Sequence, residues 1–465
     1  MEWNRRQISL ITVVMVTSFM GTFLISSINI ALPAITQSFG LSAVMVSWVI
    51  TSFLLSTAMF LLPAGRWGDL TGIRRLFKTG VVVFTLSTLM CGLAGSGGWL
   101  IVLRFLQGIG AAFTNTTGSA ILVAAFAPRY RGRVLGMSVS AVYLGLAFGP
   151  FAGGFLTQYL GWRSIFFISA FLGALTTLLA FFFLGKDEPA PRSTARIHPR
   201  STLFYMAGLM AIVYGSSHIP GTTGWSLMGC GVLLLILFWM SEKRSSSPVF
   251  DTRLFTHNRL FAFSNLAALI NYSATFAIVF LLSLYLQKVR GLTPRDAGVI
   301  LMAQPVVMAL LSPFAGRVSD RIQPRYLTSA GMTLSALGLA SFALLTDTTP
   351  LWTIIALLAG VGLGFALFSS PNMNTIMSAV DRTRYGVASG TASTMRVVGQ
   401  IVSMTIVTLF FASSFGNKAM EEVAPALFLT AMKWGFAVFA AICVPGIFFS
   451  FSRGHLQRNQ SGHPV

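Results

Sequence analysis

Long apolar runs separated by short charged loops are the feature that most limits how this chain can fold. A membrane-crossing helix needs about 20 consecutive apolar residues, and fourteen stretches of the sequence are candidates. Only 9% of the residues are charged, whereas a soluble domain carries about a quarter. Because a backbone in lipid must satisfy its hydrogen bonds internally, we expect an all-α integral membrane protein.

A trace of internal duplication runs through these segments. Gly40-Leu41-Ser42 recurs as Gly291-Leu292-Thr293, Gly65-Arg66 recurs as Gly316-Arg317, and Asp69 recurs as Asp320. Each second copy lies 251 residues after the first. A fixed offset without gaps is what a duplicated half-protein retains. Two like halves, each with a charged loop, favour a transporter.

The duplication also divides the chain into parts. It pairs the first six spans with the last six and leaves a shorter pair, at about 203–217 and 225–240, without a counterpart. We therefore predict an N-terminal six-helix bundle over 1–185 and a C-terminal one over 259–452. Residues 186–258 then form cytoplasmic linkers with the inserted pair, and 453–465 form a cytoplasmic tail.

Lys and Arg are distributed unequally between the two sides. If the N-terminus is cytoplasmic, that side holds 24 of them, and the outer loops hold five: Arg163, Lys288, Arg290, Arg295 and Lys418. Cytoplasmic loops are enriched in basic residues, so we predict a multi-pass plasma (inner) membrane protein with both termini in the cytoplasm. The net charge of +20 does not indicate nucleic acid, because the basic residues lie in short loops.

Three motifs of the first half resemble signatures of the major facilitator superfamily. Residues 65–75, Gly-Arg-Trp-Gly-Asp-Leu-Thr-Gly-Ile-Arg-Arg, resemble its cytoplasmic loop signature, and residues 103–110, Leu-Arg-Phe-Leu-Gln-Gly-Ile-Gly, resemble its fourth-helix signature. Residues 145–154, Gly-Leu-Ala-Phe-Gly-Pro-Phe-Ala-Gly-Gly, resemble the fifth-helix signature of its exporters. Fourteen spans with a central pair resemble the drug:proton antiporter family of multidrug exporters.

The resemblance implies the major facilitator fold, with fourteen transmembrane helices arranged as two six-helix bundles plus an inserted central pair. It implies a secondary active transporter that exports amphipathic organic compounds or drugs by alternating access. We expect its partners to be the lipid bilayer, a small amphipathic substrate, and protons or a counter-substrate. No cofactor, metal or nucleic acid is expected, and we expect a monomer.

The resemblance also implies a set of gating residues. In this superfamily the acid of the loop signature approaches the start of the eleventh bundle helix, here near Tyr385, and a carboxylate at a helix N-terminus is favourable. In the fifth-helix signature, glycines permit close helix contact, and proline bends the helix. The expected set is Arg66, Asp69, Arg74, Arg75, Gly145, Gly149, Pro150, Gly153, Gly154, Arg317 and Asp320.

Acidic side chains are missing from the spans. None of the twelve Asp and Glu residues, and none of the five His, falls in the interior of a candidate span. The family's first helix usually carries Asp in a pattern ending Asn-Val-Ala-Leu-Pro, whereas this chain has Leu24 at the acid's place before Asn29-Ile30-Ala31-Leu32-Pro33. A proton relay in a membrane normally needs such a group, so the coupling partner stays open.

Basic and polar residues do enter the spans. Arg396 lies eleven residues into its helix, about 16 Å deep, on a polar stripe with Ser393 and Gln400. Such an Arg commonly faces water, a partner or a ligand. Arg104 lies five residues past Trp99, so it either snorkels to the interface or faces the cavity. The expected cavity residues are Ser26, Asn29, Arg104, Asn115, Asn271, Tyr272, Gln304, Asn374, Arg396 and Gln400.

Other classes of function fit the sequence less well. No Gly-rich loop followed by Lys-Ser/Thr encodes an ATPase, and no acid or His cluster at depth encodes a hydrolase, so we do not expect an enzyme. One alternative is a carrier or flippase for an anionic or zwitterionic, lipid-like substrate with Arg396 and Arg104 as charge partners. A membrane sensor without transport is a further alternative.

Overall fold

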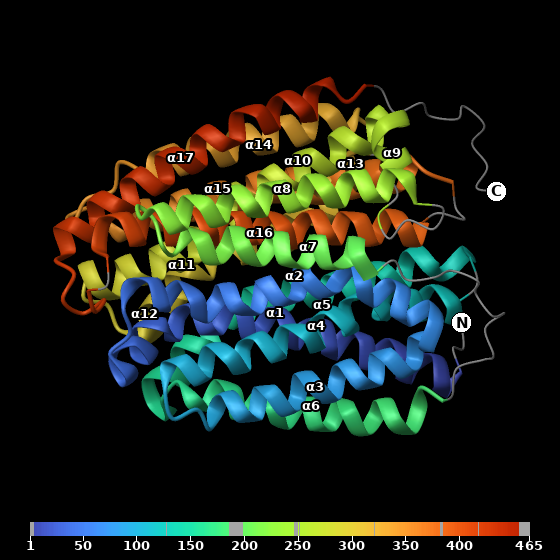
Figure 1. Ribbon diagram of the computed structural model, residues 1–465, viewed down its shortest axis with the longest axis horizontal. Helices are drawn as coiled ribbons and strands as arrows, with labels where there is room; N and C mark the ends of the chain where they lie inside the picture. The colour runs from blue at the N-terminus through green and yellow to red at the C-terminus, as the bar shows by residue number, and fades with distance from the viewer. Residues whose placement is uncertain are drawn as a thin grey trace.

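The computed structural model describes residues 4–126, 128–185, 199–245, 250, 252–319, 321–381, 385–416 and 418–454. Helices run side by side along one axis, and the start of the first and the end of the last lie at the same end (Figure 1). We call this end the terminal side and the opposite end the far side. The described residues form no strand, apart from an isolated bridge between Ser42 and Ala419.

The first bundle comprises six helices: α1 (Arg5–Phe39), α2 (Ala43–Thr71), α3 (Ile73–Gly92), α4 (Gly97–Ala125), α5 (Pro128–Leu160) and α6 (Arg163–Phe183). Helix α1 packs on α5, α2 packs on α4, and α3 packs on both α4 and α6.

The second bundle contains α10 (Arg259–Thr275), α11 (Ala277–Leu284), the π-helical turn η1 (Tyr285–Val289), α12 (Pro294–Leu301), α13 (Ala303–Ser319), α14 (Pro324–Phe342), α15 (Leu351–Ser378), α16 (Tyr385–Phe415) and α17 (Pro425–Ser452). Two stretches that the sequence predicts as single spans are interrupted here, one at Phe276 between α10 and α11 and one at Met302 between α12 and α13, and η1 follows directly on α11. A π-helical turn adds one residue to the hydrogen-bonded ring and commonly marks a functional position.

The duplicated turn folds in the same way in both halves. Gly40 and Gly291 take left-handed backbone angles, with φ of 60° and 64°. Two residues later, the hydroxyls of Ser42 and Thr293 accept hydrogen bonds from backbone N–H groups in the first turn of α2 and α12. Glycine at the end of one helix and a Ser or Thr cap at the start of the next are common helix stop and start signals.

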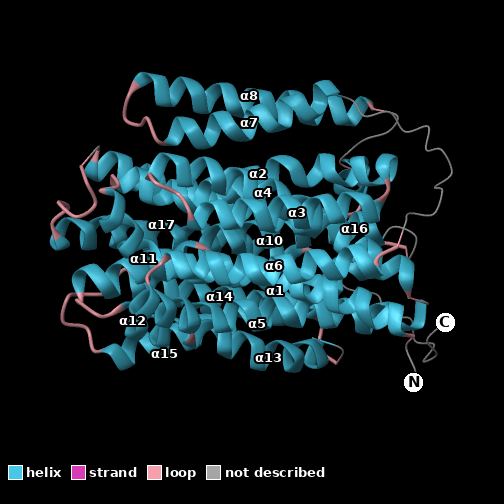
Figure 2. Cartoon of the chain, turned by 90° about the horizontal axis from the view of Figure 1, so that it is seen from below, coloured by secondary structure: helices cyan, strands magenta, loops and turns pink. Residues whose placement is uncertain are grey.

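Between the bundles, α7 (Pro199–Ser216) and α8 (Thr222–Arg244) form a hairpin, followed by the short α9 (Thr252–His257). Figure 2 shows the hairpin on one flank of the molecule. Helix α7 contacts α2 of the first bundle and α16 of the second. The Tyr205 hydroxyl donates to the Ala58 carbonyl at 3.1 Å, and the Trp48 indole donates to Ser217 at 2.7 Å.

Twelve of the described helical segments are long and apolar enough to cross a membrane. All the predicted spans are helical, but α7 and α14 are not among the twelve. Helix α7 begins with the polar stretch Pro-Arg-Ser-Thr within its 18 residues, and α14 carries several Ser and Thr residues in 19. The predicted all-α membrane architecture is confirmed, while fourteen crossings remain a prediction.

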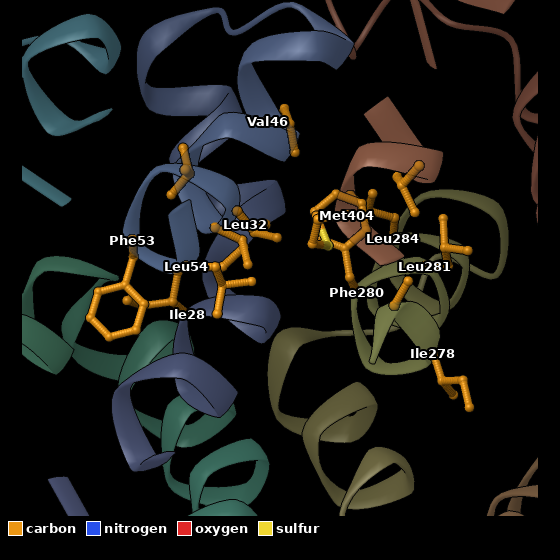
Figure 3. Close-up of a cluster of buried hydrophobic side chains, with 14 of the residues drawn as sticks. Ile28, Leu32, Val46, Phe53, Leu54, Ile278, Phe280, Leu281, Leu284 and Met404 are labelled. Carbon is orange, nitrogen blue, oxygen red and sulfur yellow. The ribbon is translucent and has the colours of Figure 1, made fainter. Parts of the chain in front are cut away.

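The two bundles meet in the far half of the molecule. Helix α2 packs on α16, α5 on α12, and α1 on α11. One buried apolar cluster contains Ile28 and Leu32 of the first bundle together with Leu284 and Met404 of the second (Figure 3). Polar contacts join the same elements: Ser283 donates to the Asn29 carbonyl at 2.6 Å, and Ser47 and Thr408 share a 2.8 Å hydrogen bond.

The fifth-helix signature forms two close helix contacts. A Cβ on Gly145, Gly149 or Gly153 would lie within 2.6 Å of atoms of α1. On the other side of α5, a Cβ on Gly154 would lie 2.5 Å from the Pro294 carbonyl oxygen of the second bundle. Gly298 approaches the Pro150 carbonyl in the same way. We call Pro150, Gly154, Pro294 and Gly298 the glycine seam, and it admits no larger side chain.

Candidate functional site

A pocket of about 380 Å³, a volume that includes open solvent at its mouth, lies in the second bundle between α10, α15 and α16. Its lining residues are Ala268, Tyr272, Phe368, Ser369, Asn372, Met373, Ile376, Ala392, Ser393 and Arg396. Ala392 and Arg396 lie seven and eleven residues into α16, so the pocket reaches about 10 to 17 Å from the terminal side.

Among the residues that the structure describes, Arg396 is the only charged one that lines this pocket. It is half-buried, and within the described part of the chain no hydrogen bond or salt bridge occupies its guanidinium. The rest of the wall is apolar or neutral. A guanidinium in such surroundings is a donor set for a carboxylate, sulfate or phosphate, since it carries five N–H groups in a planar fork.

Neutral polar groups complete one wall of the pocket. The Tyr143 hydroxyl, from α5 of the first bundle, shares a 3.0 Å hydrogen bond with Ser369. Asn372 donates through Nδ2 to the Ser264 carbonyl at 3.0 Å. The Tyr272 ring meets Phe365 edge to face, with centroids 5.4 Å apart. One side chain of the first bundle therefore contacts the pocket wall of the second.

Two of the ten predicted cavity residues, Tyr272 and Arg396, line the pocket together. Gln400 lies one turn farther along α16 and is half-buried. Asn115 and Asn374 are exposed, and Asn374 donates to Ser319 at 3.3 Å.

Four of the others lie buried in helix packing. Ser26 donates to the Leu146 carbonyl at 3.3 Å. Asn29, Asn271 and Gln304 are at most 9% exposed, and each has a side-chain atom without a protein partner. Buried polar groups of this kind commonly bind water or a ligand, but none of the four lines the pocket.

Arg104 occupies neither of the two predicted positions. It is fully buried in the first bundle, so it does not snorkel to the interface, and it does not line the pocket. Its Nε donates to the Val49 carbonyl at 3.0 Å, its Nη1 donates to Gln107, and its guanidinium lies 4.4 Å from the Phe53 ring centroid. Gln107 in turn donates to Thr88 at 2.5 Å. These partners fix Arg104 between α2, α3 and α4.

The predicted gating loop joins α2 to α3 through Gly72, whose φ is 100°. Arg66 and Arg74 are half-buried, Arg75 is exposed, and Arg317 is exposed in the last turn of α13. Asp69 lies in the last turn of α2, but its side chain is outside the described part, as is all of Asp320. The expected approach of Asp69 to the start of α16 therefore stays a prediction.

Sequence reasoning missed the pocket residue Ser369 and its hydrogen-bond partner Tyr143. They are 226 residues apart, and no periodicity links a tyrosine of the fifth span to a serine of the tenth. Only the tertiary fold, in which the Tyr143 hydroxyl of α5 reaches Ser369 of α15, brings them together. The available signal was weak: Tyr143 is a lone polar aromatic residue two positions before the glycine signature.

A family model described as Major Facilitator Superfamily matches residues 14–404 and 264–463. The chain is 28% identical over 429 residues to the riboflavin transporter RibZ of Clostridioides difficile, covering 92% of this chain and 93% of that protein. It is 31% identical to the multidrug resistance protein Stp of Mycobacterium tuberculosis, with 82% and 71% covered. It is also 31% identical to the cephamycin export protein CmcT of Amycolatopsis lactamdurans, with 87% and 85% covered.

Solved structures share the fold. A bacterial homologue of the human lysosomal transporter Spinster aligns with a TM-score of 0.68 and 16% identity, covering 97% of this chain and 98% of the other. A D-xylose-proton symporter aligns with the same TM-score and 12% identity, with 96% and 97% covered.

Proposed function

The chain belongs to the Major Facilitator Superfamily, and we propose that it exports amphipathic organic compounds that carry a negative or zwitterionic charge. Secondary transport is the activity of this family, which is not an enzyme family. The finer assignment rests on the pocket in which Arg396 is the one charged lining residue. A transporter for lipid-like anions, working as a carrier or flippase, would use the same pocket.

The charge preference follows from the cost of burying a guanidinium. An Arg at the centre of a membrane helix costs about 2.5–3.5 kcal/mol on insertion scales. A substrate carboxylate, sulfate or phosphate would offset part of that cost, whereas a permanent cation would add repulsion. Apolar residues such as Phe368, Met373 and Ile376 line the same pocket, so an apolar body attached to the anionic group would also be accommodated.

Export is supported by two observations of different kinds. The fifth-helix glycines pack tightly against α1 and α12, as an exporter signature at a closed seam would require. Several similar proteins are named for resistance or export, and one for riboflavin transport. We propose that residues 1–185 and 259–452 rock against each other, so that the glycine seam opens and closes the far side.

Under this proposal the terminal side, with its basic loops, faces the cytoplasm at an inner membrane, because cytoplasmic loops are enriched in Lys and Arg. The proposed protein is a monomer with fourteen crossings. The pocket then accepts substrate from the cytoplasm. No acid of the described part of the chain lines it, so proton coupling through a carboxylate in the pocket is not part of the proposal. A counter-substrate, or protons carried by another group, would complete the cycle.

The test is uptake into inside-out membrane vesicles at two pH values, with and without a protonophore. A suitable panel contains neutral riboflavin, its anionic 5′-phosphate and the lipophilic cation tetraphenylphosphonium. We expect the anionic compound to be preferred over its neutral parent and over the cation. Uptake of the cation alone, abolished by the protonophore, would replace this proposal with ordinary cation–proton antiport.

A further inference from the structure

Arg453, the first residue after α17, is buried although the sequence places it in a tail. Its side chain is only 2% exposed. It lies at the terminal side, where the ends of α10, α14, α15 and α17 come together, since its hydrogen-bond partners belong to the first three of these helices. A buried charge needs partners that replace water, and these partners identify what Arg453 does.

Three side chains accept hydrogen bonds from the Arg453 guanidinium. Nη1 donates to Asn372 Oδ1 at 2.8 Å and to Ser264 Oγ at 3.3 Å, and Nη2 donates to Thr328 Oγ1 at 2.6 Å. Ser450 shares a 2.8 Å hydrogen bond with Thr328. In the described part of the chain, no carboxylate pairs with Arg453. Its positive charge is therefore held by neutral dipoles and is not cancelled.

Asn372 connects this charge to the pocket, because it lines the pocket wall and contacts Arg453 directly. A guanidinium can only donate, so the Asn372 side chain must present its oxygen to Arg453. Its amide nitrogen then points to the Ser264 carbonyl at 3.0 Å. Arg453 thus fixes which way the amide faces, and the second N–H of Nδ2 has no partner among the described residues.

We propose that Arg453 is a positioning residue of the pocket: it orients Asn372 as a hydrogen-bond donor and adds a second positive charge behind the wall that carries Arg396. The consequence is a pocket whose potential is more positive than Arg396 alone would make it. This inference rests on the proposed function, but it can be tested without knowing the substrate.

The test measures the electrostatic potential in the pocket with two thiol reagents of opposite charge. The three cysteines, Cys91, Cys230 and Cys443, are replaced, and Ser393→Cys places one thiol on the pocket lining. Purified protein is labelled with 2-sulfonatoethyl methanethiosulfonate, an anion, and with its 2-trimethylammonioethyl counterpart, a cation. The ratio of the two rates reports the local potential and cancels differences in access.

We expect Arg453→Met to lower the anion-to-cation rate ratio by about 3- to 10-fold, as Coulomb's law gives for a unit charge several ångströms away at a high effective dielectric constant. Arg453→Lys keeps the charge and should hold the ratio near the parent value. Lys433→Met is the matched control, because it removes one charge from the same helix 20 residues, or about 30 Å, away. Elution volume and melting temperature verify folding.

Orientation of Asn372 is tested by a double-mutant cycle with riboflavin 5′-phosphate as the probe. Arg453→Lys and Asn372→Ala should each weaken binding. The fold loss of affinity in the double variant should be at least about 3-fold smaller than the product of the two single losses, as expected for residues of one network. Independent effects would overturn the positioning role.

The outcomes separate this inference from the proposed function. If Arg396→Met lowers the labelling ratio and Arg453→Met does not, the inference fails and the proposed function stands. If neither variant changes the ratio, or the thiol introduced by Ser393→Cys does not react, the pocket is not the positive site described and both fail.

Discussion

Replacing Arg396 by alanine removes the only charged side chain that lines the pocket, and the consequence for binding has a definite sign. A hydrogen bond to a charged group contributes about 1.5–3 kcal/mol. The pocket is open to solvent on one side, so the lower half of this range applies. Because 1.4 kcal/mol corresponds to a tenfold change in affinity, we expect an anion to bind about tenfold more weakly. A cation of the same size should bind equally well or more tightly.

Triphenylacetate and methyltriphenylphosphonium suit this measurement, since they have nearly the same size and opposite charge, and the carboxylate can accept hydrogen bonds from the guanidinium. Equilibrium dialysis against purified protein gives the dissociation constant of each for wild type and Arg396→Ala. Arg396→Lys is the matched control, because it keeps the charge but loses the planar fork. It should retain most of the preference for the anion. Added salt should reduce the preference in wild type more than in the alanine variant.

One result would refute the charge argument. If wild type prefers the phosphonium and Arg396→Ala binds it more weakly, the guanidinium cannot be selecting anions. Arg396 would then have a structural role in α16, and the charge preference would need another origin.

Three further predictions concern the moving parts. Tyr143→Phe removes the hydrogen bond to Ser369, worth about 0.5–1.5 kcal/mol. It should change the dissociation constant of a ligand in the pocket by about 2- to 10-fold without loss of folding, and equal dissociation constants in dialysis would contradict this. Gly154→Val would clash with the Pro294 carbonyl and destabilise this conformation by about 1–3 kcal/mol. Transport into vesicles should therefore fall, and a cysteine introduced near the far side should become more reactive. Asp69→Asn should impair transport but leave expression intact, because a charge at a helix end contributes about 0.3–1 kcal/mol. If the variant transports at the wild-type rate, the loop only sets the orientation of the protein in the membrane.

Local patterns predicted the elements that depend on local physics. Apolar length located the helices, and the repeated Gly-Leu-Ser/Thr turn predicted the matching turns at Gly40 and Gly291. The polar stripe on one face of α16 identified Arg396, and a polar cluster on α10 identified Tyr272, both of which line the pocket. Each prediction used residues within a few turns of one another, where helical spacing fixes which side chains share a face.

Tertiary partners explain where sequence reasoning went wrong. The distance of Arg104 from the end of its span allows a position at the membrane interface or one facing the cavity. In the structure, the Val49 carbonyl and the Phe53 ring of α2 enclose it instead. Glu242 falls just past the predicted helix at about 225–240, in the predicted cytoplasmic linker, but it is 1% exposed and accepts hydrogen bonds from Ser201 and from the Phe250 backbone at 2.6 and 2.9 Å. These partners are set by helix packing, which one sequence read alone does not show.

The three guanidinium groups at issue show that burial alone does not identify a binding residue. Arg104 and Arg453 are the more deeply buried, and each donates to fixed acceptors on neighbouring helices. Nη2 of Arg104 has no partner among the described residues, but the side chain is fully enclosed and cannot be reached. Arg396 is only half-buried, lines a pocket and has no such acceptor among the described residues. The free energy of ligand binding comes from donors that lack protein partners and can be reached, since saturated donors gain little from a ligand. We therefore propose Arg396 as the residue that contacts an anion, with Arg453 acting on the pocket through Asn372.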